Sequence, residues 1–179
     1  MKRLFTATPF ASAEFDQWYR DIRLRYPQFD WYRPSDLHIT LQFLGNVADD
    51  LTATVSQRLQ TIRPAGHQIN FKTTQLNAFY KKGKPFVVWL GLKADENLAV
   101  LYQESSKLLR GLYQDRNMEY IPHITLFRCK NNQALAVEKF LLENTILLDH
   151  DAQIERFCLF EANLEESDNR FAVLKCFNL

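Results

Sequence analysis

The sequence predicts an α+β fold built mainly from antiparallel strands, and three observations support this class. Runs of alternating apolar and polar residues recur along the chain, as expected for strands with one buried face. Segments with apolar residues at helical spacing separate these runs, and the connections are short. The tetrapeptide His-Ile-Thr-Leu occurs twice, at 38–41 and 123–126, in strand-like contexts. The length predicts one domain, 1–179, with room for two halves.

The amino-terminal part predicts two strands, each followed by a helix. Residues 3–10 alternate as a strand, and Ser12 can cap a helix whose apolar positions recur at helical spacing. A run of β-branched and aromatic residues at 37–47 predicts the second strand. An aspartate at 49 or 50 then begins a helix that ends before the proline at 64.

The remainder continues the alternation of strands and helices. A Lys-Lys-Gly-Lys-Pro turn signal at 81–85 separates two strands, and the polar turn 165–169 separates the two closing strands. The strands are expected at 69–80, 86–92, 123–129, 153–162 and 170–177, with helices at 98–112 and at about 133–142.

Charge and cysteine usage exclude several classes of protein. A net charge of +1, from 22 basic and 21 acidic residues, argues against broad charge-driven binding to duplex nucleic acid. It is compatible with a small anionic ligand held by a few groups. Cys129, Cys158 and Cys176 are odd in number and lack CxxC spacing, which predicts a reduced, cytoplasmic protein without a disulfide or a structural zinc.

The amino terminus loosely imitates a signal peptide, but its apolar run is short and is broken by Thr6, Thr8 and Pro9. A first strand is therefore the expected reading. No stretch approaches the roughly 18 apolar residues of a membrane-spanning helix. The short chain without heptads predicts a monomer.

The repeated tetrapeptide places polar groups on one face of each strand. Side chains alternate along a strand, so His38 and Thr40 share one face, with Ile39 and Leu41 on the other. The second copy has the same pattern. If the two strands meet near a pseudo-two-fold axis, two histidines and two threonines line one pocket.

Such a pocket suits acid–base chemistry on a phosphodiester. One imidazole can act as base and the other as acid near neutral pH. Threonine hydroxyls and a nearby arginine can bind phosphate oxygens. Arg128 follows His123 by five positions, so simple alternation places it on the opposite face. Ordinary packed histidines or a zinc site are the alternatives, although no third zinc ligand is evident; His67 and His150 lie in polar loop contexts.

The twin motifs resemble the two H-x-T-x signatures of the 2H phosphoesterase superfamily. More narrowly, the chain is similar to the bacterial RNA 2′,3′-cyclic phosphodiesterases, also called 2′-5′ RNA ligases. The similarity includes the opening strand, "LHITLQFLGNV", "VVWLGL", "YIPHITLFR" and the closing "LFEANLEESDNRFAVLKCF".

The resemblance implies a bilobal, pseudo-two-fold fold of two intertwined lobes, with two antiparallel sheets lining a central cleft and helices outside. It implies hydrolysis of RNA or nucleotide 2′,3′-cyclic phosphates to 2′-phosphomonoesters, without a metal or other cofactor. His38 would donate a proton to the departing 3′ oxygen, and His123 would accept one from water. Thr40, Thr125 and Arg128 would bind the phosphate oxygens.

One position departs from the family pattern. Relatives often carry Pro-Arg before the "VVW" strand, whereas this chain has Pro85 and Phe86. Phe86 can stack on a base, be neutral to function, or leave the charge to the lysines at 81, 82 and 84. Phe43 is either a packed strand aromatic or a second stacking residue.

Two other functions stay open at this point. The same histidines could catalyse the reverse chemistry and form a 2′-5′ linkage as a minor activity. A binding module for RNA ends or nucleotides without turnover is the alternative outside the enzyme class. Intact histidine and threonine in both motifs argue against the binding module, because binding alone gains little from two titratable groups.

Overall fold

The computed structural model describes residues 1–179 apart from 11, 63–67, 114–118, 131, 145–150 and 164–169. The expected turn at 165–169, His67 and His150 therefore lie outside the described residues. The strands are β1 (Lys2–Pro9), β2 (Asp30–Trp31), β3 (His38–Val47), β4 (Ile69–Lys81), β5 (Lys84–Ala94), β6 (His123–Arg128), β7 (Asp151–Ile154), β8 (Arg156–Ala162) and β9 (Phe171–Asn178). The helices are α1 (Ala13–Arg25), α2 (Leu51–Leu59), α3 (Glu96–Leu109), α4 (Ala134–Glu143) and the short 3-10 helix η1 (Pro34–Asp36).

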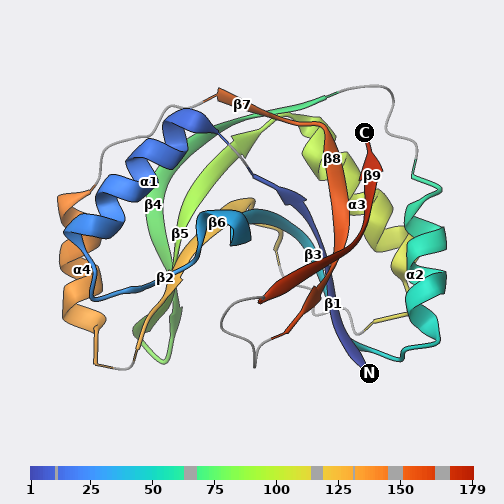
Figure 1. Cartoon of the computed structure of the whole chain (residues 1–179), viewed down its shortest axis with the longest axis horizontal. Helices are drawn as coiled ribbons and strands as arrows, with labels where there is room; N and C mark the ends of the chain where they lie inside the picture. Colours follow the sequence, from blue (N-terminus) through green and yellow to red (C-terminus); the bar gives the residue numbers. More distant parts are fainter. Residues whose placement is uncertain (11, 63–67, 114–118, 131, 145–150, 164–169) are drawn as a thin grey trace.

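The described strands form one curled antiparallel sheet in the order β7-β4-β5-β6-β3-β1-β8-β9, with β2 beside β6 (Figure 1). The α+β class and the antiparallel pairing are confirmed. The two expected sheets are present as halves that meet at β3 and β6. Their junction is narrow, because it rests on a single residue pair, Ile39 opposite Ile124.

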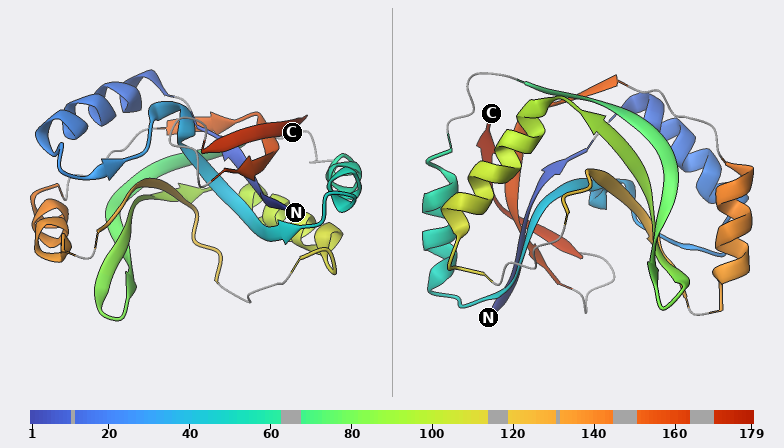
Figure 2. Two further views of the ribbon diagram at one scale, coloured as in Figure 1. Left: turned by 60° about the horizontal axis from the view of Figure 1, so that its bottom comes forward. Right: turned by 180° about the vertical axis from the view of Figure 1, so that it is seen from behind.

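The four α-helices of the described chain lie outside the curl, α1 and α4 over one half and α2 and α3 over the other (Figures 1 and 2). The chain crosses between halves repeatedly: β1 belongs to one half, and the helix that follows it covers the other. This arrangement leaves the concave face of the sheet free of these α-helices.

Helix α1 shows how local sequence and packing agree. Ser12 is its N-cap, and the Ser12 hydroxyl accepts a hydrogen bond from the Phe15 N–H at 3.4 Å. Phe15, Tyr19 and Ile22 recur at helical spacing and are fully buried. The Tyr19 hydroxyl donates to the backbone oxygens of Tyr32 and Leu126, at 2.8 and 3.1 Å, and so ties the helix to β6.

The expected closing strand 153–162 is divided between the two halves. β7 pairs with β4 in one half, whereas β8 pairs with β1 and β9 in the other. The short β2 was not expected, because two residues are too few to show an alternating pattern. Both differences depend on partners far away in the chain.

The expectation of three reduced cysteines is wrong for two of them. Cys158 and Cys176 lie opposite each other in the β8–β9 pair and form a disulfide across 18 residues. Cys129 has a free thiol, whose pKa is raised to about 11 by burial. The register of β8 against β9 brings the pair together, and cysteine spacing alone does not reveal that register. The cytoplasmic location stays a prediction.

None of the helices among the described residues is long and apolar enough to cross a membrane.

Candidate active site

The two His-Ile-Thr-Leu motifs are neighbours at the centre of the sheet. β3 and β6 run antiparallel, and the central isoleucines of the two motifs, Ile39 and Ile124, form their shared residue pair. Antiparallel pairing about this point relates the motifs by a local two-fold, as expected from the repeat. Repulsion between the protonated forms of the two rings contributes to lowering the pKa of His38, which is consistent with their proximity.

Both histidine rings are held by the same kind of hydrogen bond to a backbone oxygen. His38 Nδ1 lies 2.7 Å from the backbone oxygen of Asp36, and His123 Nδ1 lies 2.7 Å from that of Ile121. Because a carbonyl oxygen can only accept, Nδ1 must carry the proton in each ring. Nε2 is then left as the basic nitrogen of the neutral ring, available to a substrate.

Each motif strand also contains a bulge at its leucine. In the β1–β3 pair, Ala7 lies opposite Thr40 and Thr6 lies opposite Gln42, so Leu41 is the extra residue. In the β5–β6 pair, Trp89 lies opposite Thr125 and Val88 lies opposite Phe127, so Leu126 is the extra residue. The sequence repeat thus encodes a repeated backbone irregularity.

The bulges change which side chains reach the concave face. Directly paired residues point to the same side of a sheet. In β5, Val87 and Trp89 are two positions apart and so point to the same side. Their partners in β6 are Arg128 and Thr125, respectively. Arg128 therefore shares a face with Thr125 and His123. The simple alternation that places Arg128 on the far side is wrong, because the bulge shifts the phase by one residue.

Phe43 is the counterpart of Arg128 in the other motif. It lies opposite Phe5, which is in phase with Ala7, so Phe43 shares a face with Thr40 and His38. Its side chain is 62% exposed, so it is not a packed core aromatic. Each motif thus presents a histidine, a threonine and the residue five positions after the histidine.

His38 lies in an almost closed aromatic environment. Its ring centroid is 5.0 Å from Phe5, 4.9 Å from Phe171 and 6.0 Å from Phe160. Burial in these surroundings lowers the pKa of His38 to about 4, against the opposing effect of the hydrogen bond to Asp36. A small pocket of about 130 Å³, lined in part by Phe160 and Phe171, opens beside the ring.

His123 is more accessible and has fewer aromatic neighbours. Phe79 contacts it edge-on at 5.0 Å, and Trp89 lies at 5.6 Å. Burial lowers the pKa of His123 as well, and the hydrogen bond to the Ile121 oxygen opposes this shift. Both imidazoles are therefore predominantly neutral at pH 7 in the free protein.

Arg128 is oriented by a residue that the sequence did not indicate. Its Nε donates to the Tyr32 hydroxyl at 3.0 Å. Tyr32 is buried between β2 and η1, and its ring lies 5.9 Å from Phe171, which also contacts His38. The sequence did not assign four aromatic residues to the site, because the tertiary structure alone brings them there: Tyr32, Phe79, Trp89 and Phe171.

Phe86 lies at the margin of the site. It is the extra residue of a bulge in β5, because Phe79 lies opposite Val87 and Tyr80 opposite Pro85. Its ring is 37% exposed and 6.4 Å from that of Phe79. The lysines at 81, 82 and 84 are exposed at the tip of the same hairpin. Phe86 is thus reachable by a ligand that extends beyond His123.

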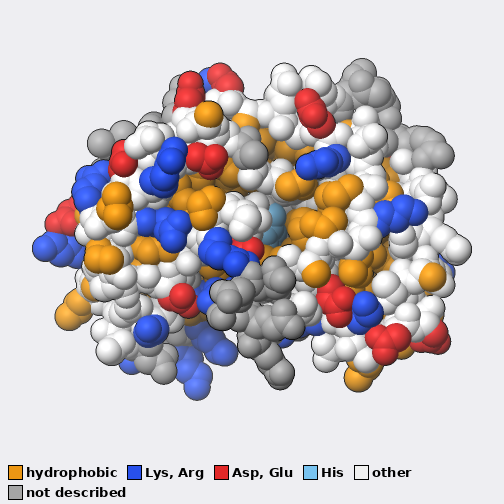
Figure 3. Space-filling view, in the orientation of Figure 1, with side chains coloured by type: hydrophobic (Ala, Val, Ile, Leu, Met, Phe, Trp, Pro, Cys, Tyr) orange, Lys and Arg blue, Asp and Glu red, His pale blue; other side chains and the backbone are white. Residues whose placement is uncertain are grey.

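The surface around the histidines is asymmetric. Figure 3 shows a recessed histidine at the centre of this face, with hydrophobic side chains on the side of β8 and β9. Lysine and arginine side chains gather on the opposite side, over α1 and β2. Among the described residues, no group of three or more His, Cys, Asp or Glu side chains is arranged to hold a metal ion.

The chain is similar in sequence to proteins of one known family. Residues 11–165 match the model of the 2′-5′ RNA ligase superfamily. An RNA 2′,3′-cyclic phosphodiesterase of Aquifex aeolicus is 24% identical over 152 residues, which cover 83% of this chain and 81% of the relative. That of Aeropyrum pernix is 32% identical over 111 residues, covering 60% and 62%.

Solved structures show the same fold. The structure of E. coli LigT complexed with 3′-AMP superposes with a TM-score of 0.77 at 22% identity, covering 99% of this chain and 98% of that one. The TT0787 protein of Thermus thermophilus superposes with a TM-score of 0.74 at 20% identity, covering 99% and 97%. The family match extends over most of the chain, so this protein belongs to the 2′-5′ RNA ligase superfamily of 2H phosphoesterases.

Proposed function

We propose that the protein hydrolyses 2′,3′-cyclic phosphodiesters at RNA ends, or in small nucleotides, to 2′-phosphomonoesters. The observation that carries the proposal is the pair of histidines at the β3–β6 junction, each with its Nδ1 held by a backbone oxygen. The relatives named RNA 2′,3′-cyclic phosphodiesterase support the same reaction. The whole chain, 1–179, would act as one catalytic unit, since each half supplies one motif.

In this mechanism the cyclic phosphate binds between the two Nε2 atoms. His123 Nε2 accepts a proton from water, whose oxygen forms the new bond to phosphorus. The bond from phosphorus to the 3′ oxygen breaks, and His38 Nε2 gives that oxygen its proton. The assignment of donor to His38 and acceptor to His123 follows the family pattern. Proton exchange with solvent then restores both rings.

The low pKa of His38 imposes a requirement on this assignment. A donor must carry its proton when the reaction begins, and burial opposes this in the free protein. The negative charge of a phosphate bound beside Nε2 favours the imidazolium, so substrate binding would bring the proton to His38. Substrate binding would therefore favour the protonated form of His38 that acts as the general acid.

Three further side chains would stabilise charge on the phosphate. The Thr40 and Thr125 hydroxyls lie on the same face as the histidines and can donate to the non-bridging oxygens. Arg128, held by the Tyr32 hydroxyl, adds a permanent positive charge with directional N–H donors. Such preorganised donors can stabilise the extra charge of the pentacoordinate transition state.

The proposal is tested with a short RNA that ends in a 2′,3′-cyclic phosphate, incubated with the protein in excess EDTA. The expected product carries a 2′-phosphate, and the rate with EDTA equals the rate without it. A 3′-phosphate product, or loss of activity that added metal restores, would contradict the mechanism.

A second RNA with a 5′-hydroxyl in the same assay measures ligation. Hydrolysis should dominate, because water is present in large excess over any RNA acceptor. A folded protein that binds 2′-AMP without turnover would instead support the binding-module alternative.

A further inference from the structure

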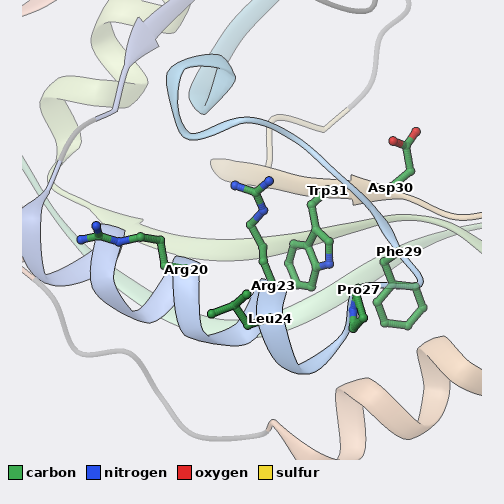
Figure 4. Close-up of a pocket in the computed structure, with 7 residues that line it drawn as sticks. All are labelled: Arg20, Arg23, Leu24, Pro27, Phe29, Asp30 and Trp31. Atoms are coloured by element: carbon green, nitrogen blue, oxygen red, sulfur yellow. The ribbon is translucent and has the colours of Figure 1, made fainter.

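A second concave site lies outside the histidine cleft, between α1 and β2. It has a volume of about 570 Å³, and its lining includes Arg20, Arg23, Phe29, Asp30 and Trp31 (Figure 4). The Phe29 ring is buried, so the groove offers two arginines and the partly exposed ring of Trp31. Proteins that bind single-stranded nucleic acids commonly use arginine for phosphates and flat rings for bases.

The two arginines are available to an anion. The Arg20 guanidinium donates to the neutral Gln17 side chain, at 3.3 Å. Arg23 lies 5.5 Å above the Tyr19 ring. Within the part of the chain that the structure describes, neither guanidinium forms an ion pair with a carboxylate.

Trp31 provides a rigid apolar wall. Its Nε1 donates to the Tyr26 oxygen at 2.8 Å, and its ring packs 4.6 Å from Phe127 and 5.6 Å from Tyr19. The ring is half-buried, so part of it stays open to the groove. A base that stacks on this ring meets a side chain that is already held in place, so binding carries no cost for ordering Trp31.

The groove adjoins the catalytic cleft around β2, because Trp31, opposite Phe127, faces α1, whereas the preceding residue, Asp30, faces the cleft. Asp30 lines the groove and lies opposite Arg128 in the β2–β6 pair. Its carboxylate is 3.6 Å from Arg170, which offsets its repulsion of a phosphate. The five residue-to-residue steps from His123 to Arg128 span at most about 17 Å of strand. That is roughly five stacked nucleotides at about 3.4 Å each, and fewer if the RNA strand is extended.

We propose that this groove between α1 and β2 binds the single-stranded RNA that precedes the cyclic phosphate, with Arg20 and Arg23 on phosphates and Trp31 beneath a base. The inference rests on the proposed function and adds the substrate class to it: oligoribonucleotides are preferred to mononucleotides. The net charge of the whole chain is only +1, so the cations that gather on the side of α1 and β2 are a local feature of the surface.

The test compares 2′,3′-cyclic AMP with oligoadenylates of two, four and eight nucleotides that end in the cyclic phosphate. For the native protein, kcat/KM should rise with length and level off by about five nucleotides. Arg20→Gln/Arg23→Gln should lower kcat/KM for the octamer on the order of tenfold, as expected for lost charged hydrogen bonds. The mononucleotide 2′,3′-cyclic AMP does not reach the groove, so its kcat/KM should not change.

The matched control is Arg25→Gln/Lys139→Gln, which removes the same charge from α1 and α4 outside the groove. It should behave as the native protein on every length. The salt dependence of octamer binding should fall in the groove variant by about 0.7 in slope per lost phosphate contact. Equal effects in both double variants, or no gain in kcat/KM with length, would overturn the inference.

Binding is measured separately by fluorescence anisotropy with an octamer that ends in a 2′-phosphate. This readout needs no turnover, so failure of the proposed reaction and failure of the groove can be told apart. A weaker Kd in the groove variant alone supports the inference even if no substrate is hydrolysed. Unchanged Kd in that variant overturns it even if hydrolysis is fast.

Discussion

The two motif strands have the same backbone and different surroundings. Both hold a histidine through a carbonyl two residues earlier, and both bulge at leucine. Yet His38 is buried among phenylalanines, whereas His123 is half-buried. Phe43 follows one histidine, and Arg128 takes the equivalent place after the other. A repeated sequence thus builds a symmetric frame, and the unrepeated neighbours give its two halves different chemistry.

The histidines are the sharpest test of this division of labour. His38→Asn and His123→Asn should each reduce kcat by roughly 10²–10⁴-fold, since each removes one positioned acid or base. Asparagine keeps a donor near the position of Nδ1, so the hydrogen bond to the backbone oxygen can survive.

Circular dichroism and thermal unfolding provide the control for fold. If either folded variant retained near-native kcat, the two-histidine mechanism would be wrong.

Arg128 and Phe43 occupy equivalent positions, but their substitution should affect different kinetic constants. Arg128→Gln should lower kcat by about 10²–10³-fold, as for the loss of a preorganised donor to a developing charge. Phe43→Leu should leave kcat close to native and raise KM for nucleotides by up to about tenfold, because stacking binds ground and transition states alike.

Steady-state kinetics on 2′,3′-cyclic AMP separates kcat from KM for both variants. Phe86→Leu, in the β4–β5 hairpin, is measured beside Phe43→Leu as a second aromatic-to-aliphatic variant. If Arg128→Gln changed KM alone, Arg128 would serve in binding and not in catalysis.

The buried histidine also makes stability depend on pH. The pKa of His38 is lowered to about 4 in the folded state from 6.5, so the unfolded chain binds more protons between these values. The contribution of neutral, buried His38 to the free energy of unfolding is fully present above pH 6.5 and is lost as the pH falls towards 4. The free energy of unfolding should drop by about 3 kcal/mol over this interval through His38 alone.

Urea unfolding at pH 7 and pH 4.5 measures the effect, with His38→Asn as the reference that lacks it. If the free energy of unfolding changed with pH equally in the native protein and in His38→Asn, burial of His38 would not be the cause of the pH dependence. NMR titration of the His38 ring with 2′-AMP present should show a raised pKa. If His123 gained the proton instead, the acid and base roles would be exchanged.

Much of the fold and of the site could be predicted from the sequence, because both depend on local patterns. Alternating runs located the strands around both motifs, and Ser12 located the start of α1. The repeated motif located both histidines and threonines, and its chemistry indicated phosphate. Arg128 was named as well, but its direction depended on a bulge that alternation does not reveal.

The sequence by itself therefore determined the elements, the repeat and the chemical groups available for catalysis. Only the tertiary structure decided the bulges at Leu41 and Leu126, the disulfide of Cys158 with Cys176, and the division of 153–162 into two strands. Tertiary structure also brought Tyr32 to Arg128 and opened the groove beside Trp31. The physical reason is shared: each of these features depends on the register between strands distant in sequence. Register is set by how both partners bury their faces together, and neither strand alone contains that information.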